Sequence, residues 1–182
     1  IGTNSRTLIG NTLNALWRLV PAGNNLYVYT KATSNTAGYA YRLSNGSLTK
    51  LLGPLNGLTI NPNSSGTRML YSYADRGMTK VFVKNLQSNA ISEVYPVTLP
   101  EKCVWSVVNT NILICAAPNG GAEINQPESW YQGKIFFSDS VWLFDTNNQT
   151  AEIILEPERR FNLSLDITEP KLSPNESYLT FV

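Results

Sequence analysis

The residue types that carry most protein chemistry are scarce in this chain. Histidine is absent, which removes the commonest general base and the commonest transition-metal ligand. Two cysteines, Cys103 and Cys115, fall short of the four ligands of a structural zinc site, and no histidine can activate either as a nucleophile. We therefore assign no catalytic, metal-binding or cofactor-binding residue, and expect a protein that is not an enzyme.

The carboxylates show no spacing that selects a reaction. Asp139 and Asp145 flank the Val-Trp-Leu-Phe run, and Glu156, Glu158, Asp166 and Glu169 lie near the start of the last repeat. A pair for glycoside hydrolysis would need two carboxyl groups held at a defined separation, and nothing in the sequence singles out such a pair. We expect these acids to be solvated turn residues.

The cysteines have a spacing that suits a disulfide. If the chain turns about Asn109, Cys103 and Cys115 stand equally far from the turn and face each other across two antiparallel strands. Directly opposed residues have Cα atoms about 4.5–5.5 Å apart, which a disulfide accepts, and the bond would imply an oxidising compartment. A slip of one residue would put the two on opposite faces, so two buried free thiols remain the alternative.

A candidate partner-binding segment runs from 117 to 138. Pro127 and Gly133 bracket a stretch typical of a one-turn helix, because proline favours helix starts and glycine helix ends. Residues 134–137 are a further strand candidate. Trp130 and Tyr131 lie within the helix and could anchor a partner, since aromatic residues dominate binding hot spots. The alternative is that both rings fold back and cap the hydrophobic edge of their sheet.

The rest of the chain consists of short β-type runs separated by turn residues. Asn45-Gly46 is the strongest hairpin signal, because both central residues of the tight turn need positive φ. Pro21 and Pro62, at corresponding turns of two successive units, are about 41 residues apart, within the roughly 40–45-residue period of a four-stranded propeller blade. We predict blade-like repeats at about 13–52, 57–95 and 102–156, a partial one at 166–182, and an insertion at 117–138. A β-sandwich of short strands is the alternative.

Two segments carry a resemblance to a known family. Leu172-Ser-Pro-Asn-Glu-Ser-Tyr-Leu-Thr-Phe-Val182 and Ile60-Asn-Pro-Asn-Ser-Ser-Gly-Thr-Arg-Met-Leu-Tyr71 resemble the Ser-Pro-Asp-Gly-Lys hairpin of TolB-like and WD-repeat-like bacterial β-propellers. Val141-Trp-Leu-Phe-Asp145 is similar to the third strand of such a blade. The motif is degenerate, with Glu176 in place of the usual glycine. The resemblance implies a propeller with a binding or scaffold role, often outside the cytoplasm, and carries no fixed catalytic residues.

The predicted architecture is an all-β chain of propeller blades, each of four antiparallel strands, with one loop-helix insertion. About three and a half blades can be counted, fewer than the four to eight of complete propellers. Open sheet edges are prone to pair with other chains. We therefore expect either a protein partner or a further segment of the same protein to complete the propeller.

Charge and hydropathy narrow the choice of partner. The 14 basic and 13 acidic residues give no field for nucleic acid, and no apolar run approaches the length of a membrane span. The leading prediction is a non-enzymatic binding or scaffold module of the bacterial cell envelope, in the periplasm or at the cell surface, that acts through protein–protein interaction. Trp130, Tyr131 and Arg18 are its candidate contact residues, Arg18 because first strands line the propeller axis.

Two other functions remain alternatives. One is an enzyme-associated or glycan-acting propeller domain, such as a hydrolase, a lyase or a peptidase accessory domain. It would need a polar cluster at the axis, where Arg18, Thr59 and Ser106 are expected. The other is a sugar lectin, which would need exposed aromatic platforms, with Trp130 first in line.

Overall fold

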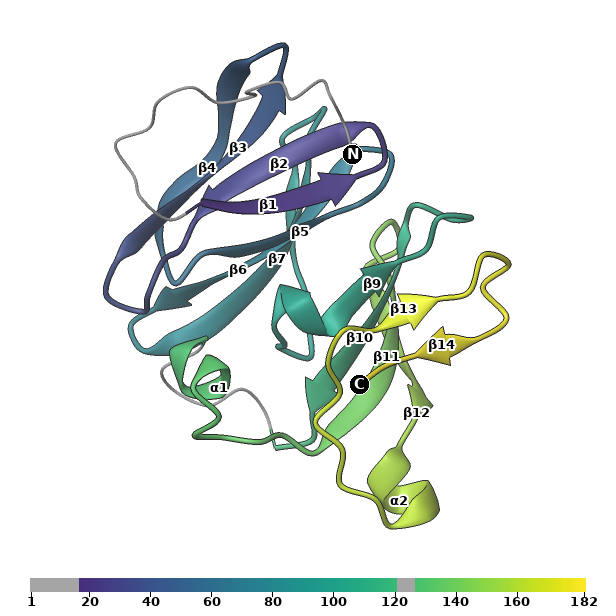
Figure 1. Ribbon diagram of the computed structural model, residues 1–182. Coiled ribbons are helices and arrows are strands. Elements are labelled where there is room, and N and C mark those ends of the chain that lie inside the picture. The colour runs from purple at the N-terminus through teal and green to yellow at the C-terminus, as the bar shows by residue number, and fades with distance from the viewer. Residues whose placement is uncertain (1–16, 121–126) are drawn as a thin grey trace, which may run out of the picture.

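Residues 17–120 and 127–182 are described by a computed structural model. They form a mostly β structure of successive antiparallel sheets (Figure 1). The first sheet holds β1 (Trp17–Ala22), β2 (Asn25–Thr30), β3 (Ala37–Ser44) and β4 (Ser47–Asn56). The second holds β5 (Thr59–Pro62), β6 (Arg68–Asp75), β7 (Met78–Asn85) and β8 (Ile91–Glu93).

The third sheet consists of β9 (Cys103–Trp105), β10 (Ile112–Pro118), β11 (Asp139–Asp145) and β12 (Thr150–Leu155). A C-terminal hairpin of β13 (Lys171–Leu172) and β14 (Leu179–Thr180) follows. In each four-stranded sheet the strands pair in chain order. In the described residues, three short helices lie in the connections: η1 (Pro100–Lys102), α1 (Glu128–Tyr131) and α2 (Pro157–Phe161). The predicted all-β class and the four-stranded antiparallel sheets are confirmed.

The turns follow the local sequence closely. Asn45 and Gly46 have φ values of 50° and 77°, and they connect β3 to β4 with Ser44 paired to Ser47. This is the tight hairpin that an Asn-Gly pair favours, because asparagine and glycine tolerate positive φ best. The first predicted repeat began at 13, and residues 13–16 lie outside the described part of the chain.

The fourth strand of the first sheet is longer than predicted. We expected it to end at Leu52, before Gly53-Pro54, but β4 continues to Asn56. Its register with β3 shifts near Ala40, and Pro54 lies on the outer edge of the sheet, where the missing amide hydrogen breaks no ladder.

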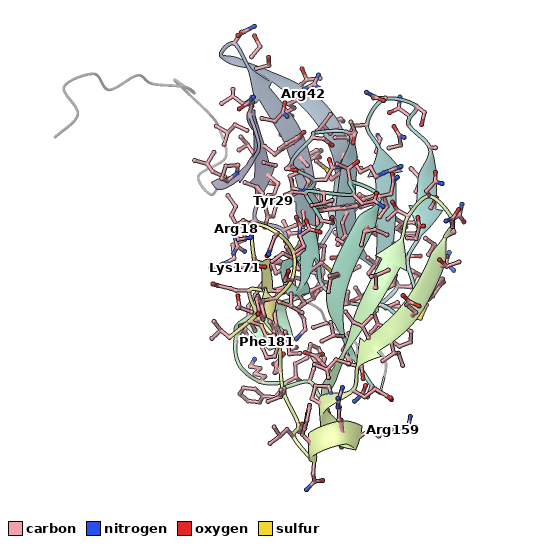
Figure 2. The ribbon with its side chains drawn as sticks, turned by 90° about the vertical axis from the view of Figure 1, so that its right-hand side faces the viewer. Arg18, Tyr29, Arg42, Arg159, Lys171 and Phe181 are labelled. Carbon is pink, nitrogen blue, oxygen red and sulfur yellow. A yellow bond between two sulfur atoms is a disulfide. The ribbon has the colours of Figure 1, made fainter. Side chains whose placement is uncertain are left out.

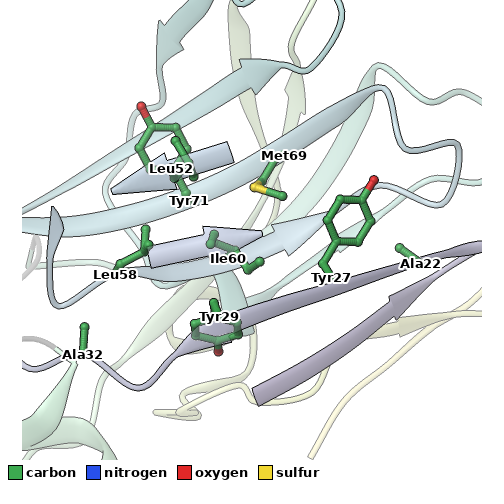
Figure 3. Packing of buried hydrophobic residues seen from close by; sticks show 10 residues of the cluster. Ala22, Tyr27, Tyr29, Ala32, Leu52, Leu58, Ile60, Met69 and Tyr71 are labelled. Carbon is green, nitrogen blue, oxygen red and sulfur yellow. The ribbon is translucent and has the colours of Figure 1, made fainter. Parts of the chain in front are cut away.

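The hydrophobic core is divided between successive sheets. Side chains of the first sheet, among them Tyr27, Tyr29 and Leu52, pack against Ile60 and Met69 of the second (Figure 3). A second cluster joins the second sheet to the third, and a third cluster joins the third sheet to the C-terminal hairpin. Each sheet is thus stabilised by burying apolar area against the next one along the chain.

Residues 134–137 do not form the predicted strand. Phe137 is buried and Phe136 is exposed. The side chains thus alternate between buried and exposed, as in a strand, but the segment pairs with no described strand. Both neighbours of β10 are already occupied, by β9 and β11. In the described part of the chain, no helix has the length and hydropathy needed to cross a membrane.

Candidate functional site

The candidate site lies where Glu101 of η1 contacts both Tyr131 of α1 and Arg18 near the start of β1. We call this region the loop face. The helix α1 belongs to the insertion of the third sheet, yet the backbone amide of Ser34, in the loop after β2, donates to the carboxylate of Glu128 in α1. The helix therefore reaches from the third sheet to the first. Pro127 precedes it and Gly133 follows it with a φ of 64°, as the sequence predicted.

Arg18 and Tyr131 meet at one carboxylate on the loop face. The Tyr131 hydroxyl donates to Glu101 Oε1, and Arg18 NH1 lies 3.8 Å from the same oxygen. Arg18 also contacts the phenol oxygens of Tyr29 and Tyr131, and Figure 2 shows Arg18 beside Tyr29. We refer to Arg18, Tyr29, Glu101 and Tyr131 as the arginine cluster. It brings together two of the three residues predicted to bind a partner.

Exposure within the arginine cluster is uneven. The Arg18 side chain is 58% exposed and Tyr131 is 39% exposed, whereas Tyr29 is buried and Glu101 is largely covered. The covered Glu101 carboxylate thus fixes Arg18 and Tyr131, and both side chains remain partly exposed to solvent. Such pre-ordering lowers the entropy cost of binding a partner.

Burial dominates the electrostatics of the arginine cluster. It raises the pKa of Glu101, and the hydrogen bond from Tyr131, the nearby Arg18 and a hydrogen bond from Thr59 oppose this rise. Burial also raises the pKa of Tyr29 and of Tyr131, with the Glu101 carboxylate acting in the same direction. Both phenols are therefore neutral donors at neutral pH.

A second group of charges lies buried under α1. Lys102 and Asp139 are fully buried, and Lys102 Nζ lies 2.7 Å from Asp139 Oδ2 while also contacting Asp166 Oδ1. The ring centroids of Trp130 and Phe137 are each 5.1 Å from the same nitrogen. We refer to these five residues as the lysine cluster.

The lysine cluster contradicts the prediction that Asp139 and Asp166 are solvated turn residues. Asp139 Oδ2 also accepts the amide hydrogen of Ile167 at 2.8 Å. Burial raises the pKa of Asp139, and the adjacent Lys102 opposes that rise. Buried charges occur in proteins chiefly when paired, and the partner of these two acids lies far from both in the sequence.

Trp130 and Tyr131 have different surroundings. The Trp130 indole Nε1 donates to both oxygens of Asp166, at 2.9 and 3.2 Å, so this ring packs against the lysine cluster. Tyr131 keeps an accessible ring. The two ring centroids are 5.6 Å apart, a distance at which aromatic rings pack against each other.

The polar residues expected at the axis do not converge. Thr59 is buried and pairs with Ser72, Oγ to Oγ, at 2.8 Å. Ser106 lies at the opposite end of its sheet, where its Oγ donates to Glu176 Oε2 at 2.7 Å. Of the three, Arg18 and Thr59 lie near Glu101 and Ser106 does not.

Cys103 and Cys115 are directly opposed in the β9–β10 ladder. Their Cα atoms are 4.0 Å apart and their sulfurs are bonded, with 2.14 Å between them. The spacing about Asn109 places them on the same face, and both lie in the core between the second and third sheets.

Sequence reasoning missed Glu101 and Lys102. A usable signal was present, since the two charges follow Pro100 inside the otherwise uncharged stretch from Val94 to Val108. An isolated charge pair between apolar segments is typical of a buried ionic contact.

The fold is that of a β-propeller-like protein, with antiparallel four-stranded sheets packed in succession. The chain is similar to TolB from Acinetobacter baumannii, with a TM-score of 0.59, 13% sequence identity, and coverage of 91% of this chain but only 37% of that one. The apo isopeptidase AtxE2 gives a weaker match, with a TM-score of 0.46, 15% identity, and coverage of 83% and 30% of the two chains. No protein-family model and no curated protein matches in sequence. The likeness to TolB concerns the fold alone.

Proposed function

We propose that this protein is a non-enzymatic binding module of the TolB-like propeller kind, which recognises a protein partner through its loop face. The observation that carries the proposal is the arginine cluster. Arginine and tyrosine are among the residues most enriched in interface hot spots. Here Arg18 and Tyr131 stand side by side, are partly exposed and are held by a common carboxylate.

The role of a binding surface is supported by how the polar groups of the loop face are used. Among the described residues, the buried carboxylates of the loop face serve as partners of Lys102, Arg18 and Tyr131. Thr59 is likewise engaged by Ser72.

We further propose that a partner or another segment of the same protein completes the propeller. The C-terminal hairpin has two strands where the preceding sheets have four, and Tyr178 on it is 73% exposed. Unpaired strand edges beside exposed apolar side chains favour β-pairing with another segment. If the purified protein is a stable, monodisperse monomer by light scattering, this second proposal is wrong for that form.

An extracytoplasmic location is part of the proposal. The Cys103–Cys115 disulfide supports it, because such bonds persist mainly in oxidising compartments. An export assay would test the location: a thiol-trapping reagent added to living cells should leave both cysteines unmodified, and modification of both would contradict it.

The partner proposal is tested by site-specific photo-crosslinking. A photoreactive phenylalanine analogue replaces Tyr131 in one sample and Tyr95, which is 56% exposed in the connection after β8, in the matched control. We expect position 131 to give a discrete adduct with an envelope protein that position 95 does not give. Arg18→Glu should abolish this adduct while leaving the circular dichroism spectrum unchanged. Identical adduct patterns at the two positions would refute the loop face as the binding surface.

A further inference from the structure

The lysine cluster has a chemical composition that a simple ion pair does not require. A fully buried amine touches two carboxylates. Two aromatic rings enclose the amine. An indole N–H points at one of the carboxylates. Burying ions is costly, since each loses its hydration, and condensation of the amine with one carboxylate removes two of the three charges.

We propose that Lys102 and Asp166 condense spontaneously to an isopeptide bond, with Asp139 as the proton carrier. Asp166 is the electrophile because Trp130 Nε1 donates to its carboxylate at 2.9 Å and can stabilise negative charge developing on the oxygen. Its side chain is 15% exposed, which gives the water formed a way out. Asp139 is fully buried and has no such route.

The steps balance without any other reactant. The Asp139 carboxylate takes one proton from the Lys102 ammonium, and the free amine attacks Cγ of Asp166. The tetrahedral intermediate then loses one carboxylate oxygen as water. That oxygen receives the proton returned by Asp139 and a second proton from the attacking nitrogen. One C–N bond forms, one C–O bond breaks, and Asp139 ends in its starting state.

The surroundings of Asp139 suit this role. Its Oδ2 lies 2.7 Å from Lys102 Nζ and can take the proton directly, while its buried Oδ1 has no hydrogen-bond partner. Burial raises the pKa of Asp139, which favours its protonated form during the transfer. The titratable groups facing it are Lys102 and Asp166. After condensation, the new amide N–H can donate to Asp139 and the new carbonyl can accept from Trp130, so no buried polar group of the bond is left unpaired.

The bond would join the connection before the third sheet to the segment before the C-terminal hairpin. It would close a covalent loop from 102 to 166 that contains the whole third sheet, beside the disulfide at Cys103. The predicted modification is therefore a second internal cross-link, one that reducing agents do not break.

Mass spectrometry of the purified protein tests the proposal. After reduction and denaturation, we expect a mass lower than that of the sequence by one water molecule. Trypsin should fail to cut after Lys102, since acylation removes its charge. Peptide 85–134 should appear uncut and linked to peptide 161–171, which contains Asp166. A mass equal to that of the sequence would overturn the proposal, and so would a water loss that peptide mapping assigns to any other residue.

Variants separate the role of Asp139 from the fold. Asp139→Asn should restore the full mass in a protein whose circular dichroism is unchanged, whereas Asp145→Asn, at the other end of β11, should keep the water loss. A folded Asp139→Asn protein that still lacks one water would refute Asp139 as proton carrier. Because the wild-type measurement stands alone, an Asp139 variant that fails to fold does not affect the main test.

Discussion

Replacing Glu176 should separate two opposing effects on how tightly the C-terminal hairpin is held to the third sheet. These effects are backbone strain and side-chain hydrogen bonding. Glu176 has a φ of 56°, in the left-handed region, which costs a non-glycine residue about 1–2 kcal/mol. Its carboxylate accepts hydrogen bonds from Ser106 Oγ at 2.7 Å and from the amides of Val107 and Val108 at 2.6 and 3.1 Å. The backbone conformation of Glu176 is therefore unfavourable, whereas its hydrogen bonds to the third sheet are favourable.

The expected magnitudes follow from these two terms. At this partly exposed site we take the three hydrogen bonds together as about 2 kcal/mol net. Glu176→Ala keeps the strain and loses the bonds, so it should cost about 2 kcal/mol, or about 30-fold in an equilibrium constant. Glu176→Gly loses the bonds but regains about 1 kcal/mol from the backbone. Glu176→Gln keeps a neutral acceptor and should also cost about 1 kcal/mol.

Amide hydrogen exchange is the direct assay, because Val107 and Val108 carry the amides that Glu176 binds. We expect protection of these amides to fall in the order wild type, then glycine and glutamine variants, then alanine. Equal protection in wild type and the alanine variant would refute the reasoning, as would a glycine variant less protected than the alanine variant.

The same contact should depend on pH. Partial desolvation raises the pKa of Glu176, but the hydrogen bonds from Ser106, Val108 and Val107 outweigh it, so the pKa in the folded protein is below the ordinary value of 4.5. The stabilisation is then complete above about pH 4.5 and is lost as the pH falls through the lower folded value. Glu176→Gln should show no such loss.

Three further outcomes are expected in urea unfolding. Replacing Cys103 and Cys115 by serine should lower the free energy of unfolding by about 2–3 kcal/mol, since the disulfide closes a loop between residues 12 apart; no change relative to oxidised wild type would contradict this. Leu113→Ala, at a fully buried position of the third sheet, should cost about 2–5 kcal/mol through the cavity it leaves, and a loss below about 1 kcal/mol would mean that the site is loosely packed. Gly23→Ala should be more harmful than Gly46→Ala, because both have positive φ but an added Cβ meets a backbone oxygen at 2.2 Å only at Gly23; equal effects would argue against the close approach.

The parts of the fold that the sequence predicted depend on neighbours in the chain. Asn45-Gly46 formed its hairpin because the turn needs only the two residues that occupy it. The opposed positions of Cys103 and Cys115 followed from counting outward from one turn. The succession of sheets was visible for the same reason, since each antiparallel sheet is closed by short connections.

The parts that were missed depend on contacts between distant segments. Asp166 looked like a turn residue, and only the fold brings it to Lys102, from which it is separated by 64 positions. Residues 134–137 had the composition of a strand, but no edge of β10 was free to pair with them. Tyr131 bonds to Glu101, which is 30 positions away in the sequence, and no local pattern pairs these two residues.

The contact between Ser34 and Glu128 links residues 94 positions apart, which has a consequence for the order of folding. Hairpins close early because their loops are short, whereas contacts of such sequence separation form late. A chain that has folded only its individual sheets would therefore still lack α1 in its final place, and with it the joint surface of Arg18 and Tyr131. A partner that binds this surface would bind fully folded molecules and not partly folded ones.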